Sequence, residues 1–213
     1  MGKYFNIPSA DELKELMKNP GQIKGTSFLG DIEYVREKKG EEGLKRVEEE
    51  TKKLGFPIEY GKIKENDWYS IGLRLVSFTA ILNTFGWGEK ELAEIAQNSP
   101  KVSFIIRFFM KYFVSPEKIF RGAAGRIWKR YYSTGSLRAM DFFRDEKGGW
   151  AILRVERMKN HPMSCFFIGA FKLSEPRFMD INFEETKCTY RGDDCDEFLI
   201  KWTYKDNKND KRF

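Results

Sequence analysis

The stretch Ser136–Met158 reads SLRAMDFFRDEKGGWAILRVERM and marks the point at which the sequence pattern changes. Residues 136–143 and 150–158 alternate between apolar and polar side chains, as β-strands with one buried face do. The segment between them, Asp145–Gly149, is rich in charge and glycine, which is typical of a turn. The sequence therefore predicts an antiparallel hairpin here.

The residues after this hairpin continue in the same way. Residues 162–171 predict a short apolar helix, and residues 178–188 and 198–204 predict two further strands. Arg191–Asp194 has the composition of the turn between these strands. Residues 205–213 are polar, and we expect a tail there.

The residues before the hairpin predict helices, because apolar side chains recur at helical spacing between capping residues, glycines and prolines. The expected helices cover residues 8–19, 28–39, 41–54, 66–85, 89–97, 99–114 and 115–131. We expect an α+β fold, in which a helical N-terminal half packs on a C-terminal antiparallel β-sheet. Residues 1–22 are expected to form a helical extension. Residues 23–204 are expected to form a single domain of the ligand-binding type, with helices over 28–131 and the sheet, including the short helix, over 136–204.

The composition excludes several classes of protein. The chain has 213 residues, a net charge of +6, three cysteines and one histidine. Its 41% of hydrophobic residues is too high for a disordered chain. Three cysteines cannot form a disulfide framework, and we expect a cytoplasmic location. A single histidine excludes metal sites that need several, so cysteine must supply much of any metal shell.

The three cysteines lie near the C-terminus. Cys188 and Cys195 flank a predicted turn, Glu185 lies three residues before Cys188, and Cys165 lies on the predicted short helix. Thiolates and a carboxylate can bind Zn²⁺ in a tetrahedral shell, so these four residues form a candidate zinc site with His161 as an alternative ligand. The competing interpretation is that the cysteines are core residues, since free cysteine is among the most buried residue types.

The pattern Glu185-x-x-Cys188-x-x-x-Gly192-x-x-Cys195-x-x-Phe198-x-Ile200 resembles the C-terminal signature of the 4-vinyl reductase domain, a small-molecule-binding module. Sensor domains of bacterial transcription activators that respond to aromatic compounds belong to that family. They bind zinc through a Cys, a Glu-x-x-Cys pair and a further Cys. The resemblance implies the ligands Cys165, Glu185, Cys188 and Cys195 here, although the last ligand of those sensors lies one residue further along the chain.

A second resemblance covers more of the chain. Lys24-Gly25, followed by a helix that ends in the run REKKGEEGL at residues 36–44, is similar to the opening of haem–nitric-oxide-binding domains and their haem-free relatives. The order of helices and strands agrees as well. The family's haem requires a histidine on the helix corresponding to residues 101–131, and this sequence has none there. The family's Tyr-x-Ser-x-Arg motif appears only as Thr134-x-Ser136-x-Arg138, so the resemblance implies the fold without haem, enclosing a smaller ligand.

Residues 101–138 carry nine basic residues and one acidic residue, with aromatic side chains between them. Three interpretations remain open. The aromatic residues belong to the core and the basic residues face water, or the stretch lines a pocket for a small hydrophobic or anionic ligand, or it binds nucleic acid. The pocket interpretation assigns its walls to Phe108, Trp128 and Tyr132 and the orienting charge to Arg126 or Arg130.

Together these features favour a small-molecule-binding or sensory domain that signals through a partner or as a homodimer. No segment is long and apolar enough to span a membrane. We find no nucleophile elbow or phosphate loop, so we assign no catalytic residues. One alternative is an enzyme that acts on a tetrapyrrole or aromatic substrate. The other is a nucleic-acid-binding module that uses residues 101–138, which the modest net charge does not favour.

Overall fold

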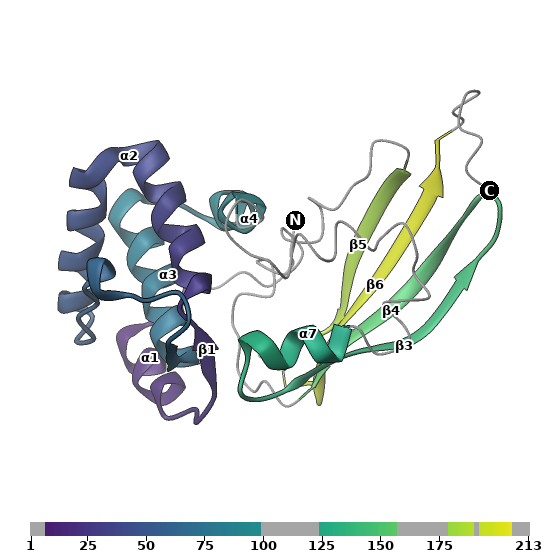
Figure 1. The fold of residues 1–213 in the computed structure, drawn as a ribbon, viewed down its shortest axis with the longest axis horizontal. Coiled ribbons are helices and arrows are strands. Elements are labelled where there is room, and N and C mark those ends of the chain that lie inside the picture. The colour runs from purple at the N-terminus through teal and green to yellow at the C-terminus, as the bar shows by residue number, and fades with distance from the viewer. Residues whose placement is uncertain (1–6, 99–123, 157–178, 190–191, 206–213) are drawn as a thin grey trace.

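The computed structural model describes residues 7–98, 124–156, 179–189 and 192–205. The N-terminal part contains α1 (Ala10–Met17), β1 (Gln22–Lys24), α2 (Thr26–Lys53), the 3₁₀ helix η1 (Tyr60–Lys62), β2 (Trp68–Ser70), α3 (Ile71–Phe85) and α4 (Glu89–Asn98). It is followed by α7 (Ala124–Tyr131), β3 (Ser136–Arg144), β4 (Gly148–Glu156), β5 (Met179–Lys187) and β6 (Cys195–Tyr204). The N-terminal helices gather on one side of the molecule and the four long strands on the other (Figure 1). The α+β expectation is therefore confirmed.

Local sequence signals set the ends of the helices. Ser9 and Glu12 form a capping box at the start of α1, with each side chain accepting from the backbone N–H of the other. The hydroxyl of Ser70 accepts from the backbone of Gly72 and begins α3. Gly86 ends α3 in the left-handed region at φ 63°, which a residue without a Cβ adopts readily.

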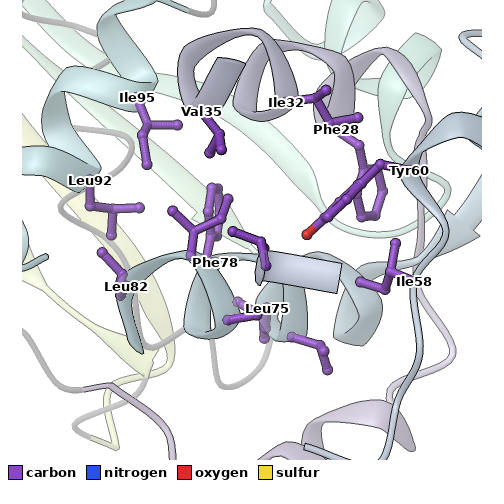
Figure 2. Close-up of a cluster of buried hydrophobic side chains, with 14 of the residues drawn as sticks. Phe28, Ile32, Val35, Ile58, Tyr60, Leu75, Phe78, Leu82, Leu92 and Ile95 are labelled. Carbon is purple, nitrogen blue, oxygen red and sulfur yellow. The ribbon is translucent and has the colours of Figure 1, made fainter. Parts of the chain in front are cut away.

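The helical core is formed by the facing sides of α2, α3 and α4. Figure 2 shows Phe28, Ile32 and Val35 from α2 against Leu75, Phe78 and Leu82 from α3. Leu92 and Ile95 from α4 close one end, and Ile58 and Tyr60 close the other (Figure 2). Leu13 and Leu16 of α1 join the same core, so the first helix packs with the others rather than apart from them.

A buried ion pair joins α2 to α3. Both guanidinium nitrogens of Arg74 contact the carboxylate of Asp31, at 3.1 Å and 2.9 Å, and neither side chain is more than 5% exposed. The guanidinium lies over the rings of Phe78 and Phe28, with centroids 4.5 and 5.6 Å away. Burial raises the pKa of Asp31 to about 7 although Arg74 opposes the rise. The attraction within the pair therefore does not fully offset the cost of desolvating the carboxylate.

The four long strands form an antiparallel sheet in the order β3-β4-β6-β5. β4 and β6 are its central strands, and they pair without interruption from Gly148 opposite Thr203 to Glu156 opposite Cys195. One face carries the second core, which includes Leu153 of β4 and Phe183 of β5. Phe198, Ile200 and Trp202 of β6 alternate onto this face and are at most 4% exposed.

The end of α7 and the two residues that follow it connect the helices to the sheet. Trp128 belongs to the sheet core, and its ring stacks on that of Tyr132 with centroids 4.1 Å apart. Tyr132 forms a β-bridge with Ile23 of β1, and Ser133 exchanges hydrogen bonds with Gln22. Tyr132 thus contacts both hydrophobic cores.

The helical half agrees with the sequence prediction at Gly40 and differs from it in two details, the start of α3 and the presence of β1 and β2. The break expected between the helices over 28–39 and 41–54 is confirmed, because Gly40 within α2 has non-helical dihedrals, φ 67° and ψ −174°, and separates two helical segments at a kink. The helix expected from residue 66 begins at Ile71, because residues 68–70 pair with β1 as β2. Both strands are only three residues long, too short to show an alternating pattern.

Other expected features lie outside the described residues. These are the helices over 99–114 and 162–171, the start of the helix over 115–131, and residues 206–213 of the tail. No helix in the described parts of the chain is long and apolar enough to cross a membrane.

Replacing Arg74 with methionine tests the buried ion pair. The change leaves Asp31 buried without its countercharge, so we expect a loss of about 3 kcal/mol of unfolding free energy at pH 8. The loss relative to wild type will grow as pH rises above about 7, because Asp31 beside Arg74 ionises there, whereas the buried carboxyl without Arg74 holds its proton to a higher pH while the unfolded chain is already ionised. Urea unfolding at several pH values measures both effects.

Two variants serve as controls for this prediction. Asp31→Asn combined with Arg74→Met removes both charges, and its stability will lack the pH dependence contributed by Asp31. Lys14→Met breaks the exposed pair between Lys14 and Asp11 and will leave stability almost unchanged. Equal pH slopes for wild type, Arg74→Met and the double variant would contradict the prediction.

Candidate metal centre

The candidate metal centre lies where β5 ends and β6 begins. In the sheet register Glu185 is opposite Phe198, which faces the core, and Asp196 precedes Phe198 by two residues. Because side chains two apart on a strand share a face, Glu185 and Asp196 both point to the core face of the sheet. Cys188 directly follows β5, after a shift in register between Glu185 and Lys187.

Glu185, Cys188 and Asp196 bring one ligand atom each to within 4.8 Å of the other two. Cys188 is 2% and Asp196 1% exposed. Oε1 of the half-buried Glu185 is shielded from solvent and has no hydrogen-bond partner among the described residues. An unsatisfied buried carboxylate oxygen costs free energy unless a proton donor or a cation compensates it.

Hydrogen bonds hold the loop around this group. The carboxylate of Asp196 accepts from the backbone N–H of Thr189 at 2.7 Å and from its hydroxyl at 3.0 Å. The backbone N–H of Cys188 donates to Asp193 at 2.7 Å. Burial raises the pKa of Asp196 to about 6, against the bonds from Thr189, which lower it. The loop thus fixes the orientation of the Asp196 carboxylate. The groups that donate hydrogen bonds to it in these contacts are uncharged.

Cys195 is not a member of this group, although the sequence pattern nominates it. It is next to Asp196 on β6, so its side chain points to the opposite face of the sheet. Its thiol donates a hydrogen bond to Asp194 at 3.4 Å. Burial, and to a smaller extent the hydrogen bond to Asp194, raises the pKa of the Cys195 thiol to about 11. Both effects disfavour the thiolate, which is the form that binds metals.

Asp196 is the functional candidate that the sequence analysis missed. It lies one residue beyond Cys195, which is where the zinc sensors described above carry their last ligand. The available signal was strand alternation, since Asp196 shares its parity with Phe198 and Ile200. Cys165 and His161 lie outside the described residues.

The donor set of one thiolate and two carboxylates suits Zn²⁺, which accepts sulfur and oxygen ligands. Ligand atoms on one tetrahedral zinc ion lie roughly 3.5 Å apart. Side-chain rotations that move each ligand atom by about 1 Å therefore place all three within bonding distance of a single zinc ion. A fourth coordination position remains for a further ligand.

The residues expected to line a ligand pocket differ from one another in how they are placed. Trp128 is 4% exposed, and its indole N–H donates to the carbonyl of Thr134 at 2.9 Å. Tyr132 is half-buried beside it, and burial raises the pKa of its hydroxyl. Arg126 is exposed on α7, and Phe108 lies outside the described residues. The structure therefore brings Trp128 and Tyr132 together.

Comparison with solved structures shows which fold this is. The chain is similar to an oxygen-binding H-NOX domain related to soluble guanylate cyclases, with 17% identity, a TM-score of 0.58, and coverage of 90% of this chain and all of that one. An H-NOX protein from S. oneidensis in the Fe(II) state gives 12% identity, a TM-score of 0.58, and coverage of 87% of this chain and 98% of that one. The chain has an H-NOX-like fold.

Two other comparisons gave no match, one against protein-family models and one against curated proteins. A third similar structure comes from work on haem distortion in the H-NOX family, with 17% identity and a TM-score of 0.57 over 90% of this chain and all of that one. A proximal histidine is one common axial ligand of haem iron. The single histidine of the sequence, His161, lies outside the described residues.

Asp196 and Cys195 are neighbours with opposite predicted roles, which gives a matched pair of variants. Asp196→Asn removes a negatively charged ligand, and we expect zinc affinity to fall by more than about tenfold. Cys195→Ser will bind zinc as tightly as wild type, since its side chain faces away from the group. Competition with a zinc-binding dye measures both affinities, and a loss confined to Cys195→Ser would contradict the assignment.

Proposed function

We propose that the chain is a haem-free, small-molecule-binding sensory domain of H-NOX-like fold that carries a structural zinc ion. Glu185, Cys188 and Asp196 hold the ion, and Cys165 is the proposed fourth ligand. This assignment is of the 4-vinyl reductase type, with Asp196 in place of Cys195. The observation that carries the proposal is the convergence of a thiol and two carboxylates at the end of β5, one of which has an unsatisfied buried oxygen.

The zinc ion in this proposal has a structural role, which is to stabilise the folded sheet. It would tie the end of β5 to the start of β6 and thereby fix the loop from Cys188 to Asp196. Ligands from this loop are gathered only in the folded state, so the free energy of zinc binding adds to the free energy of folding.

The proposed ligand is a small hydrophobic or anionic molecule bound beside Tyr132. Tyr132 contacts both the helical core and the sheet core, so a molecule that packs against it touches both halves of the fold. Ligand sites often lie at such junctions, lined by aromatic side chains with a few polar groups. The stacked rings of Trp128 and Tyr132 supply an aromatic wall and a hydroxyl there.

The nucleic-acid alternative has less support in the described part of the basic stretch. Arg126, Lys129 and Arg130 are exposed on α7, but Trp128 between them is buried in the sheet core. A buried ring cannot stack on a base. An enzyme of tetrapyrrole or aromatic substrates has no supporting observation among the described residues.

Cofactor content tests the proposal most simply. We expect protein expressed with added haem precursor and zinc to purify with about one equivalent of zinc and without a Soret absorption band. The chelated protein will unfold at lower temperature and recover when zinc is restored. A Soret band that saturates at one haem per chain would contradict the haem-free assignment, and zinc below about a tenth of an equivalent would contradict the metal assignment.

Phenol and benzoate serve as probes for the ligand site. Binding to the folded state alone raises the unfolding free energy, by about 2.7 kcal/mol when the probe is at a hundred times its dissociation constant. We expect thermal stabilisation by at least one probe in wild type and its loss in Tyr132→Ala. Tyr69→Phe is the control, because it removes the hydroxyl of another half-buried tyrosine, one that accepts a hydrogen bond from the backbone N–H of Lys64. Equal stabilisation of all three proteins would place the probe elsewhere.

A further inference from the structure

β3 is an edge strand with an unusual surface. Within the described sheet it pairs only with β4, so its outer backbone groups have no strand partner there. The other edge strand, β5, has exposed polar side chains at Asp180, Asn182, Glu184 and Thr186. Polar and charged side chains protect sheet edges from pairing with other chains. β3 also exposes charged side chains, at Arg138, Asp141 and Arg144, but among them it exposes Met140, Phe142 and Phe143, at 44%, 38% and 50%.

The register of β3 shows which of its side chains share a face. Leu137 and Phe142 are opposite Val155 and Ala151, which face the core. Arg138 and Asp141 are opposite Arg154 and Ile152 and so point to the other face. The change in parity between them arises at Met140, where the register shifts by one residue as in a β-bulge.

This pattern is self-complementary when two β3 strands run antiparallel. If Leu137 lies opposite Phe142 of a second copy, Arg138 lies opposite Asp141 of that copy, and the two-fold axis repeats both pairs. Each pair joins side chains of the same face, as antiparallel pairing requires. The bulges of the two β3 strands then lie opposite each other at the two-fold axis. On either side of the axis, core-facing side chains of one copy therefore remain opposite core-facing side chains of the other.

The charges distinguish this register from its neighbours. A shift of two residues also keeps the faces matched, but it places Arg138 opposite Phe143 and Leu137 opposite Arg144, which brings charge against apolar side chains. A register centred on Asp141 places Asp141 opposite itself, and like charges directly opposite are destabilising. Within one chain, Arg138 forms one ion pair among the described residues, with Glu156 at 3.5 Å. Its side chain remains 63% exposed.

We propose that β3 is a self-association surface, at which two copies of this chain pair through antiparallel β3 strands with Arg138 of each opposite Asp141 of the other. The pairing buries Met140, Phe142 and Phe143 and joins the two sheets into one continuous sheet. It leaves the zinc group, at the opposite edge of the sheet, unaffected. The proposal is independent of the proposed ligand and metal.

Light scattering coupled to gel filtration tests the pairing through a charge swap. The wild-type chain of 25.1 kDa will elute with twice that mass at concentrations above its dissociation constant. Arg138→Asp and Asp141→Arg will each place like charges opposite one another and halve the mass. The double variant Arg138→Asp with Asp141→Arg restores the opposite charges and will return to the dimer mass.

Variants elsewhere on the sheet control for net charge. Lys201→Glu on β6 and Glu184→Lys on β5 make changes of the same size on exposed side chains and will remain dimeric. Far-UV circular dichroism checks that each variant is folded. The proposal is overturned if the wild type is monomeric, if both single variants remain dimeric, or if the double variant stays monomeric. It is also overturned if the wild type gains mass only when another protein or peptide is added.

Discussion

The alternation of side chains along β6 is the constraint on which the rest of the structure depends. β6 is paired on both sides, with β4 and β5, so its register cannot shift without breaking two ladders of hydrogen bonds. That register sends Phe198, Ile200 and Trp202 into the sheet core. It also sends Asp196 to the core face beside Glu185 and turns Cys195 away. The core packing of one strand therefore selects which of two neighbouring side chains can join a metal site.

The helical half depends on a different kind of interaction. The charged side chains buried in its described part are Asp31 and Arg74, which meet between α2 and α3, and the pair is specific in geometry although costly to bury. Tyr132 lies near enough to both charges for them to influence its pKa, and it also bridges to β1. The junction between the two halves thus combines aromatic packing with a buried charge pair. In the proposed sensory role, a ligand bound at this junction would shift the balance between conformations that differ in how the helices contact the sheet.

Most of the architecture follows from local sequence patterns. The capping box at Ser9, the alternation in β3 and β4, and the helical spacing of Phe28, Ile32 and Val35 were sufficient to predict the α+β class. The short strands β1 and β2 were not predictable, because their pairing joins residues far apart in the chain. Gly40 was expected to end a helix, and its non-helical conformation does separate two helical segments within α2.

The candidate site was predicted only in part. Glu185 and Cys188 follow from a motif with local spacing, whereas Asp196 depends on where β6 begins. The sequence analysis began that strand at residue 198, so it did not consider the parity of Cys195 and Asp196. An anomalous-difference map collected at the zinc absorption edge tests the resulting account most directly. The account predicts a peak within bonding distance of the Cys188 sulfur and the Glu185 and Asp196 carboxylates. A peak bonded to the Cys195 sulfur, or no peak in crystals grown with zinc, would contradict it.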